Sequence, residues 1–154
     1  MNASVGTEAG AELGIRSLSA CISVGDLDAC AAWYAEHLGF TVVQSWEFPE
    51  LAARVAYLEG HGARLELLEQ RDAEPAPRSD PPGHGAPHGV TQLVCYVADI
   101  NAALAYVRQR GLTIAMDVST LPELNIAAFF IRDLEGNLIE FIEYSPSESS
   151  GGQK

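Results

Sequence analysis

Positive charge is scarce in this chain of 154 residues, which has 9 lysine and arginine residues against 21 aspartate and glutamate residues. The formal net charge is therefore −12 at pH 7. Nucleic acids and anionic membranes attract proteins through clusters of Lys and Arg, so this balance excludes both as expected partners. Cysteine is scarce too. The three cysteines, Cys21, Cys30 and Cys95, lack CxxC or zinc-site spacing and are expected to be reduced and packed among apolar residues.

Long apolar runs are missing as well. No run approaches the roughly 18 residues of a membrane-spanning helix. The first basic residue is Arg16, so the N-terminus lacks the basic start of a signal peptide. These absences predict a cytoplasmic protein. Its length and its 47% of hydrophobic residues suffice for one domain or two small repeats with a real core.

Proline and glycine divide the chain. Five of the eight prolines lie in residues 71–89 together with three glycines, a composition that cannot support a helix or strand pairing. This segment is the predicted linker between a first module at residues 15–70 and a second module at residues 90–144. Residues 1–14 and 145–154 are small and polar without periodicity, which predicts disordered tails.

The two modules resemble each other in sequence. Residues 18–33 align with residues 91–106 at an offset of 73, and ARLELLE at 63–69 aligns with NLIEFIE at 137–143 at an offset of 74. A repeat of about 70 residues is too long for a solenoid unit and indicates two copies of one small module.

Each module opens with a β-like run that ends at an aspartate in the N-cap position of a helix, Asp26 in the first copy and Asp99 in the second. Gly39 and Gly111 are placed to end these helices, each of which has one apolar face. Three further β-like runs follow each helix, at 40–47, 54–58 and 64–70, then at 112–118, 126–132 and 137–144. The predicted fold is α+β, built from two pseudo-symmetric βαβββ modules.

Two motifs carry a family resemblance. WYAEHLGF ends the first helix at 33–40, and RDLEGNLIE lies near the C-terminus at 132–140. With the duplicated module, they resemble the vicinal oxygen chelate superfamily, which includes glyoxalase I, methylmalonyl-CoA epimerase, extradiol dioxygenases and bleomycin resistance proteins. The resemblance covers roughly residues 15–144. It implies a cup-shaped mixed sheet with the helices outside, a pocket inside the cup, and a homodimer.

In such proteins a divalent metal is usually held at four positions, two in each module. The resemblance places these positions on Ser19, Glu66, Gln92 and Glu140. Both imidazoles of the family pattern are missing, and a hydroxyl and an amide are weak ligands for zinc, iron, cobalt or nickel. We therefore expect no resident metal and no other cofactor. The runner-up is a loosely held hard cation such as magnesium or manganese.

The period-two geometry of strands also groups these side chains into four walls. The walls are Ser19, Cys21 and Ser23; Arg64, Glu66, Leu68 and Gln70; Gln92, Val94 and Tyr96; and Leu138, Glu140, Ile142 and Tyr144. The expected ligand contacts are Ser19, Cys21, Ser23, Leu68, Gln92, Val94, Tyr96, Leu138 and Ile142, with Trp46 and Tyr57 as possible stacking partners of an aromatic ligand. A mostly apolar lining with few polar groups suits a hydrophobic small molecule that carries oxygens.

Glu66 and Glu140 are the expected catalytic residues, because they occupy equivalent positions of the repeat among apolar neighbours. Two carboxylates in one apolar cup without a metal should not both ionise easily, so one would hold a proton and the pair would act as acid and base. Glu47 resembles the position of a second base in epimerase relatives. The alternative for Glu47 is a surface residue at a strand end.

The sequence favours a metal-independent enzyme that performs acid/base chemistry on a hydrophobic, oxygenated compound of the kind made in secondary metabolism. Cyclisation, isomerisation, epimerisation and dehydration all fit. Two alternatives stay open. One is a non-catalytic binding protein that sequesters a natural product or drug, as bleomycin resistance relatives do. The other is a metal-dependent lyase or epimerase in which water or substrate replaces the missing ligands.

Overall fold

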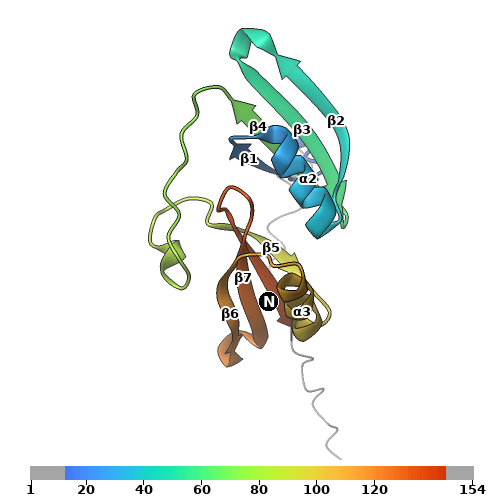
Figure 1. Cartoon of the computed structure of the whole chain (residues 1–154). Coiled ribbons are helices and arrows are strands. Elements are labelled where there is room, and N and C mark those ends of the chain that lie inside the picture. The colour runs from blue at the N-terminus through green and yellow to red at the C-terminus, as the bar shows by residue number, and fades with distance from the viewer. Residues whose placement is uncertain (1–12, 145–154) are drawn as a thin grey trace, which may run out of the picture. The chain divides into compact units, whose positions relative to one another are not determined.

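The computed structural model describes residues 13–144. Apart from Leu13 and Gly14, the predicted disordered tails therefore lie outside the described residues. The chain divides after Ala73 into two compact units, and each unit contributes a helix and a four-stranded mixed sheet (Figure 1). Within the described part of the chain, no helix has the length and apolar character needed to cross a bilayer.

The first unit, here called module 1, runs in the order β1 (Ala20–Val24), α2 (Leu27–Leu38), β2 (Thr41–Phe48), β3 (Ala53–Gly60) and β4 (Ala63–Gln70). Its strands lie side by side in the order β1-β4-β3-β2. Strand β1 is parallel to β4, and the other pairs are antiparallel. The helix supplies the crossover that a parallel pair requires.

The second unit, module 2, repeats this topology with β5 (Gln92–Tyr96), α3 (Ile100–Gln109), β6 (Ile114–Leu121), β7 (Ile126–Arg132) and β8 (Leu138–Tyr144). The strand order is β5-β8-β7-β6, again with the first and last strands parallel. The predicted α+β fold of two βαβββ modules is confirmed. Strands β3 and β6 are longer than their predicted segments, because the hairpins stay paired up to their turns.

The β2–β3 and β6–β7 hairpins turn through the same tripeptide, Pro-Glu-Leu. It forms the short 3-10 turns η1 (Pro49–Leu51) and η3 (Pro122–Leu124). The residue after each turn is left-handed, with φ of 49° at Ala52 and 56° at Asn125. Proline presets the backbone for entry into the turn, and the left-handed residue reverses the chain into the next strand.

Both helices begin at the predicted aspartate caps. The Asp26 carboxylate accepts a hydrogen bond from the Ala29 amide, and Asp99 accepts one from the Ala102 amide, each at 2.9 Å. Helix α2 ends at Gly39, whose φ of 70° is the left-handed conformation that glycine adopts without a steric penalty.

A second carboxylate reaches each helix from the last strand of its module. Glu69 accepts a hydrogen bond from the Leu27 amide at 2.7 Å, and Glu143 accepts one from the Ile100 amide at 2.6 Å. The first helical amides have no partner within a helix, and a negative charge is favourable there. These bonds hold each helix against one face of its sheet.

That face is here called the helix face, and the opposite one the open face. In β4, Leu65 and Leu67 are buried on the helix face with Glu69, whereas Glu66 and Leu68 point to the open face. In β8 the two sets are Ile139, Phe141 and Glu143 on the helix face, and Leu138, Glu140, Ile142 and Tyr144 on the open face. The helix faces carry the core of module 1 and much of that of module 2.

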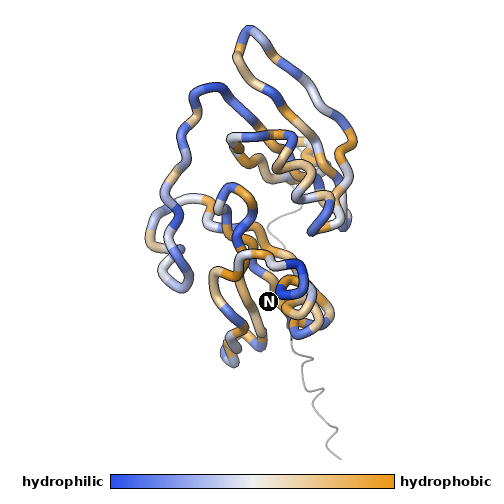
Figure 2. Tube along the Cα trace, viewed as in Figure 1, coloured by the Kyte–Doolittle hydropathy of each residue, from blue (hydrophilic) through white to orange (hydrophobic). Residues whose placement is uncertain are grey.

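Residues 71–89 connect the modules, and Figure 2 shows this segment mostly in hydrophilic colours. It contains a 3-10 turn, η2 (Gly83–Gly85). The His84 ring packs on Phe130 of β7 with the ring centroids 4.9 Å apart, and Arg132 pairs with Asp80 at 2.5 Å. The later part of the linker therefore lies against module 2, with His84 packed on it and His88 exposed.

Candidate functional site

The open face of module 2 brings Gln92 and Glu140 into direct contact. The Gln92 Nε2 donates a hydrogen bond to the Glu140 Oε2 over 3.0 Å. The Thr91 hydroxyl in turn donates to the Gln92 Oε1. Because these bonds use both ends of the amide, the Gln92 side chain is fixed in one orientation. Both Gln92 and Glu140 are half-buried.

Two tyrosines lie on the same face at the C-terminal ends of β5 and β8. The rings of Tyr96 and Tyr144 are stacked, with centroids 5.6 Å apart and planes 10° apart. The pKa of Tyr96 is raised, mainly by a hydrogen bond to Tyr144. The negative charge of Tyr144, partial desolvation and the negative charge of Glu140 raise it further, in that order. The Tyr96 phenol therefore keeps its proton at physiological pH and is hydrogen-bonded to Tyr144.

The floor between these groups is apolar. Leu138 and Ile142 share the open face with Glu140 and are only 2% and 8% exposed. Ile142 packs with Ile126 and Ala128 of β7 in one buried cluster. Val94, beside Glu140 on β5, is exposed. This face thus presents the Glu140 carboxyl group, a phenol that keeps its proton, and an apolar floor.

The open face of module 1 has a different character. Glu66 lies beside Cys21 in the parallel β1–β4 pair. Desolvation is the main cause that raises the pKa of the Cys21 thiol, followed by the charge of Glu66 and a hydrogen bond to it. Tyr57 lies opposite Glu66 on the neighbouring strand β3. Its ring contacts the Trp46 ring edge-on, with the centroids 4.7 Å apart, and the Arg64 guanidinium carbon lies 5.1 Å from the centroid of the Tyr57 ring.

Most of the predicted site residues lie on these two open faces. Ser23 and Leu68 join Cys21 and Glu66 in module 1. Ser19 comes one residue before β1 and is exposed, so it lies outside the strand that was expected to hold it. The proposed pairing of Glu66 with Glu140 in one cup stays a prediction, because the two residues belong to different units.

Glu47 is not brought together with Glu66. It pairs in register with Arg54 on the helix face, where the Glu47 carboxylate and the Arg54 Nε lie 3.8 Å apart. Its neighbour Trp46 points to the open face. Adjacent residues of a strand point to opposite faces, so Trp46 and Glu47 could not both line the same wall.

Two residues outside the expected contacts belong to these faces, namely Tyr144 and Arg64. Strand parity places both on the open faces, so the signal was present in the sequence. Their ring and cation–π contacts depend on side-chain conformation and could not be read from it.

The four positions that hold a metal in similar proteins do not fit a transition metal here. Gln92 and Glu140 bind each other, and Glu66 interacts with the Cys21 thiol. Ser19 supplies a neutral hydroxyl. Among residues 13–144, no three or more His, Cys, Asp or Glu side chains gather in the way a metal ion would require. Oxygen donors alone suit hard cations and are poor ligands for zinc or nickel.

Comparison with known proteins supports the structural picture. The lactoylglutathione lyase of Haemophilus influenzae is 28% identical over 139 residues, which cover 88% of this chain and 97% of that protein. A glyoxalase family protein from Enterococcus faecalis superposes with a TM-score of 0.70 at 19% identity, over 84% of this chain and 99% of its own. The trypanothione-dependent glyoxalase I of Leishmania major gives 0.62 at 25% identity, over 84% and 86% of the two chains.

The family model of the Glyoxalase/Bleomycin resistance protein/Dioxygenase superfamily matches residues 16–141, which include all of the strands and both helices of the two modules except the end of β8. With the duplicated βαβββ fold and the strand-borne residues Gln92 and Glu140, this match shows that the chain belongs to the Glyoxalase/Bleomycin resistance protein/Dioxygenase superfamily.

Proposed function

We propose that the open face of module 2 binds a small hydrophobic molecule with a carbonyl or hydroxyl oxygen and moves a proton on it without a metal. The contact between Gln92 and Glu140 is the observation that carries this proposal. The resemblance places metal ligands at these two positions, and here the two side chains are hydrogen-bonded to each other. The amide thereby positions a carboxylate as a proton acceptor.

The proposed chemistry begins with Glu140. An amide N–H can only donate, so the Oε2 that accepts it is unprotonated, and Oε1 is the oxygen that would accept a proton from the substrate. Removal of a proton from a carbon next to a carbonyl leaves an enolate with its charge on oxygen. The neutral Tyr96 phenol would exchange its hydrogen bond with Tyr144 for one that it donates to that oxygen. Return of the proton from Glu140 completes an isomerisation or epimerisation.

The same first step serves the other reactions that fit. If a hydroxide leaves from the adjacent carbon, the result is dehydration. If the enolate attacks a carbonyl of the same molecule, the result is cyclisation. The apolar side chains of Leu138 and Ile142 on this face favour a hydrophobic substrate. The proposed setting is the cytoplasm, where free thiols such as Cys21, Cys30 and Cys95 stay reduced.

The test is proton exchange. A panel of hydrophobic ketones and α-hydroxy ketones, including 1-hydroxy-1-phenylpropan-2-one, is incubated with the protein in D₂O. Loss of the proton next to the carbonyl is followed by NMR, and binding of the same compounds is measured by calorimetry. For an accepted compound, Glu140→Gln should lower the exchange rate about 10²–10⁴-fold while the dissociation constant changes little, because the shape of the side chain is kept.

Glu123→Gln is the matched control, since it makes the same chemical change in the exposed η3 turn of module 2. It should leave exchange at the wild-type rate. Compounds that bind but show no exchange in the wild type would identify a binding protein and overturn the catalytic proposal. Equal exchange rates in the wild type and Glu140→Gln would remove Glu140 as the base.

A metal-dependent lyase is the second candidate, and the similarity to a lactoylglutathione lyase favours it. This candidate predicts that S-lactoylglutathione forms from methylglyoxal and glutathione only after addition of a divalent cation such as Mg²⁺, Mn²⁺ or Zn²⁺. The metal-independent proposal predicts the same exchange rate with and without chelator. Both assays use the full chain.

A further inference from the structure

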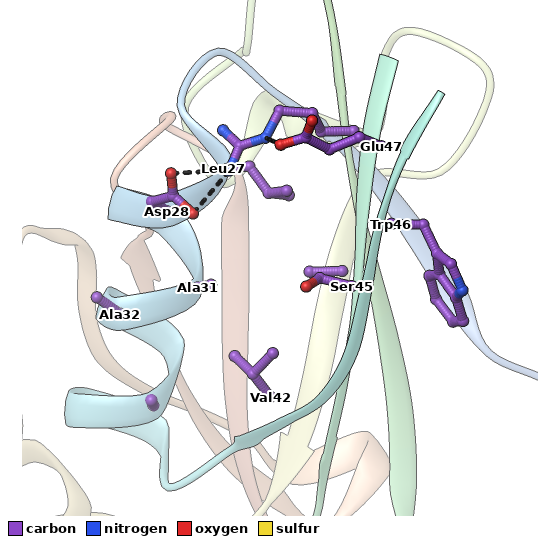
Figure 3. A pocket seen from close by; sticks show the side chains of 11 residues that line it. Leu27, Asp28, Ala31, Ala32, Val42, Ser45, Trp46 and Glu47 are labelled. Atoms are coloured by element: carbon purple, nitrogen blue, oxygen red, sulfur yellow. Dashed lines mark hydrogen bonds and ion pairs between the residues drawn. The ribbon is translucent and has the colours of Figure 1, made fainter. Parts of the chain in front are cut away.

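A cavity of about 400 Å³ lies on the helix face of module 1, between α2 and the strands β2 and β3 (Figure 3). Its volume falls in the range of about 300–1,000 Å³ that is usual for small-molecule sites. Trp46 is also among the lining residues, and in Figure 3 its ring extends from β2 away from α2. The small and apolar side chains that line it are Leu27, Ala31, Ala32, Ala35, Val42, Ser45 and Ala56.

The corresponding place in module 2 holds larger side chains. At the offset of 73 residues, Ala31 corresponds to Leu104 and Ala56 corresponds to Phe129. Leu104 and Phe129 are buried, at 7% and 0% exposure. Tyr34 of α2 is larger than its counterpart in α3, yet the cavity remains. Two alanines that line the cavity of module 1 thus correspond to large buried side chains in module 2.

One end of the cavity is charged. The Arg54 Nη2 lies 2.9 Å from both carboxylate oxygens of Asp28, and the guanidinium also lies 3.8 Å from Glu47 and 3.5 Å from Glu69. Three carboxylates thus surround one cation. The side chains of Asp28 and Glu47 are 79% and 74% exposed, so both can meet an incoming ligand. In module 2, Asn101, Thr120 and Ala127 stand in the places of Asp28, Glu47 and Arg54.

We propose that this cavity is a binding site for a small apolar amine. The alanine-lined interior would hold the apolar body, and the ammonium group would lie at the rim between Asp28 and Glu47. An anion would meet a rim with an excess of negative charge, where the guanidinium is already paired. The overall charge of −12 also attracts cations. Apart from Trp46, the lining residues lie off the open faces, and none of them belongs to the Gln92–Glu140 pair of the proposed reaction.

Three probes of similar shape and different charge test the site: 2-phenylethylamine, 2-phenylethanol and 3-phenylpropionate. Each is titrated into the ¹⁵N-labelled full chain at pH 7, and amide shifts are followed by NMR. The amine should give saturable shifts in α2, β2 and β3. The alcohol should bind about threefold to fivefold more weakly than the amine, because a partly exposed ion pair contributes about that factor to the affinity. The anion should bind more weakly still.

Two kinds of variant separate the rim from the interior. Glu47→Gln should weaken binding of the amine about threefold to fivefold and leave the alcohol unchanged. Glu36→Gln removes the same charge from an exposed position of α2 outside the cavity lining and should change neither. Ala31→Leu and Ala56→Phe introduce the module 2 residues, fill the hollow and should abolish binding of both probes.

Thermal melting of the two filled variants shows whether they fold, and an unchanged or raised melting temperature is expected because a cavity is filled. Three results would each overturn the proposal: equal affinity for the amine and the anion, shifts centred on Cys21 or Gln92 of the open faces, or wild-type amine binding by both folded filled variants. Loss of exchange in Glu140→Gln bears only on the proposed function, so the two proposals fail separately.

Discussion

At the scale of single residues, Glu66 influences the chemistry of the Cys21 thiol on the open face of module 1. Desolvation raises the pKa of the thiol most, and the charge of Glu66 and its hydrogen bond raise it further. The thiolate is the reactive form of cysteine. Although Cys21 is exposed, its reaction with electrophiles near neutral pH should therefore be slow.

Glu66→Gln removes the charge and leaves only a neutral hydrogen-bond acceptor, so it should lower the pKa of Cys21 towards its ordinary value. The thiolate fraction at pH 8 then rises, and alkylation by iodoacetamide should become about twofold to tenfold faster. Peptide mass spectrometry measures the rate at Cys21. Cys95, whose pKa is raised by burial alone, is the internal control and should react at an unchanged rate. An unchanged rate at Cys21 would contradict the assigned interaction.

Residue positions were predictable from the sequence where strand parity decides them. Parity and the repeat placed Glu66, Gln92 and Glu140 on open faces, as the structure shows. Parity also places Glu47 and Trp46 on opposite faces of β2, so the two side chains could not be expected to line one site together. The hydrogen bond between Gln92 and Glu140 was not predictable, because it depends on side-chain rotamers and on the parallel register.

At the scale of secondary structure elements, the two Pro-Glu-Leu turns form a natural comparison. Ala52 and Asn125 follow these turns with nearly the same left-handed φ. Asparagine tolerates this conformation, whereas alanine is disfavoured by about 1 kcal/mol because of its Cβ. The same turn is therefore built with a well-suited residue in module 2 and a strained one in module 1.

Ala52→Gly should raise the free energy of unfolding of module 1 by about 0.5–1 kcal/mol, because glycine removes the Cβ clash. Asn125→Ala should lower that of module 2 by a similar amount. Urea titrations followed by circular dichroism report both, and tryptophan fluorescence reports module 1, which contains both tryptophans, Trp33 and Trp46. Ala53→Gly, one residue further into β3, is the matched control. It should destabilise module 1, and stabilisation by it would contradict the assigned strain.

Helix boundaries could be predicted because their signals are local. An aspartate cap at each start and a glycine near each end are visible in the sequence, and Asp26, Asp99 and Gly39 act as expected. The second caps, Glu69 and Glu143, lie more than 40 residues away in sequence, so only the fold reveals them. The ends of strands such as β3 and β6 depend on pairing within their hairpins, so the sequence predicted these ends less well than the helix boundaries.

At the scale of the whole molecule, the repeat was enough to predict the fold, since a duplicated βαβββ pattern has few ways to bury its apolar faces. The cavity on the helix face of module 1 was not predictable. The alanines that line it are good helix formers, so in the sequence they indicate a helix and give no sign of a cavity. The ion pairs of Arg54 at its rim join α2, β2, β3 and β4, which only the fold brings together. The expected homodimer stays a prediction.

Metal content is a property of the whole protein. Because both imidazoles are replaced, the purified chain should contain less than one equivalent of zinc, nickel, cobalt or iron, and exchange activity should survive EDTA. Elemental analysis and assays before and after chelation measure this. The variant Ser19→His/Gln92→His restores the imidazoles and serves as the comparison, with increased zinc affinity expected. Stoichiometric metal in the wild type, with activity lost on chelation, would support the lyase candidate instead.

The pairing of the first strand of each module with its last has a consequence for synthesis on the ribosome. Strand β1 has no neighbour in its sheet until β4 emerges, and the same holds for β5 and β8. The amide of Leu27 likewise waits for Glu69. Because module 1 ends before Glu74, it can close completely while module 2 is still being translated. Duplication therefore limits the time that each first strand spends without a neighbour to the synthesis of one module.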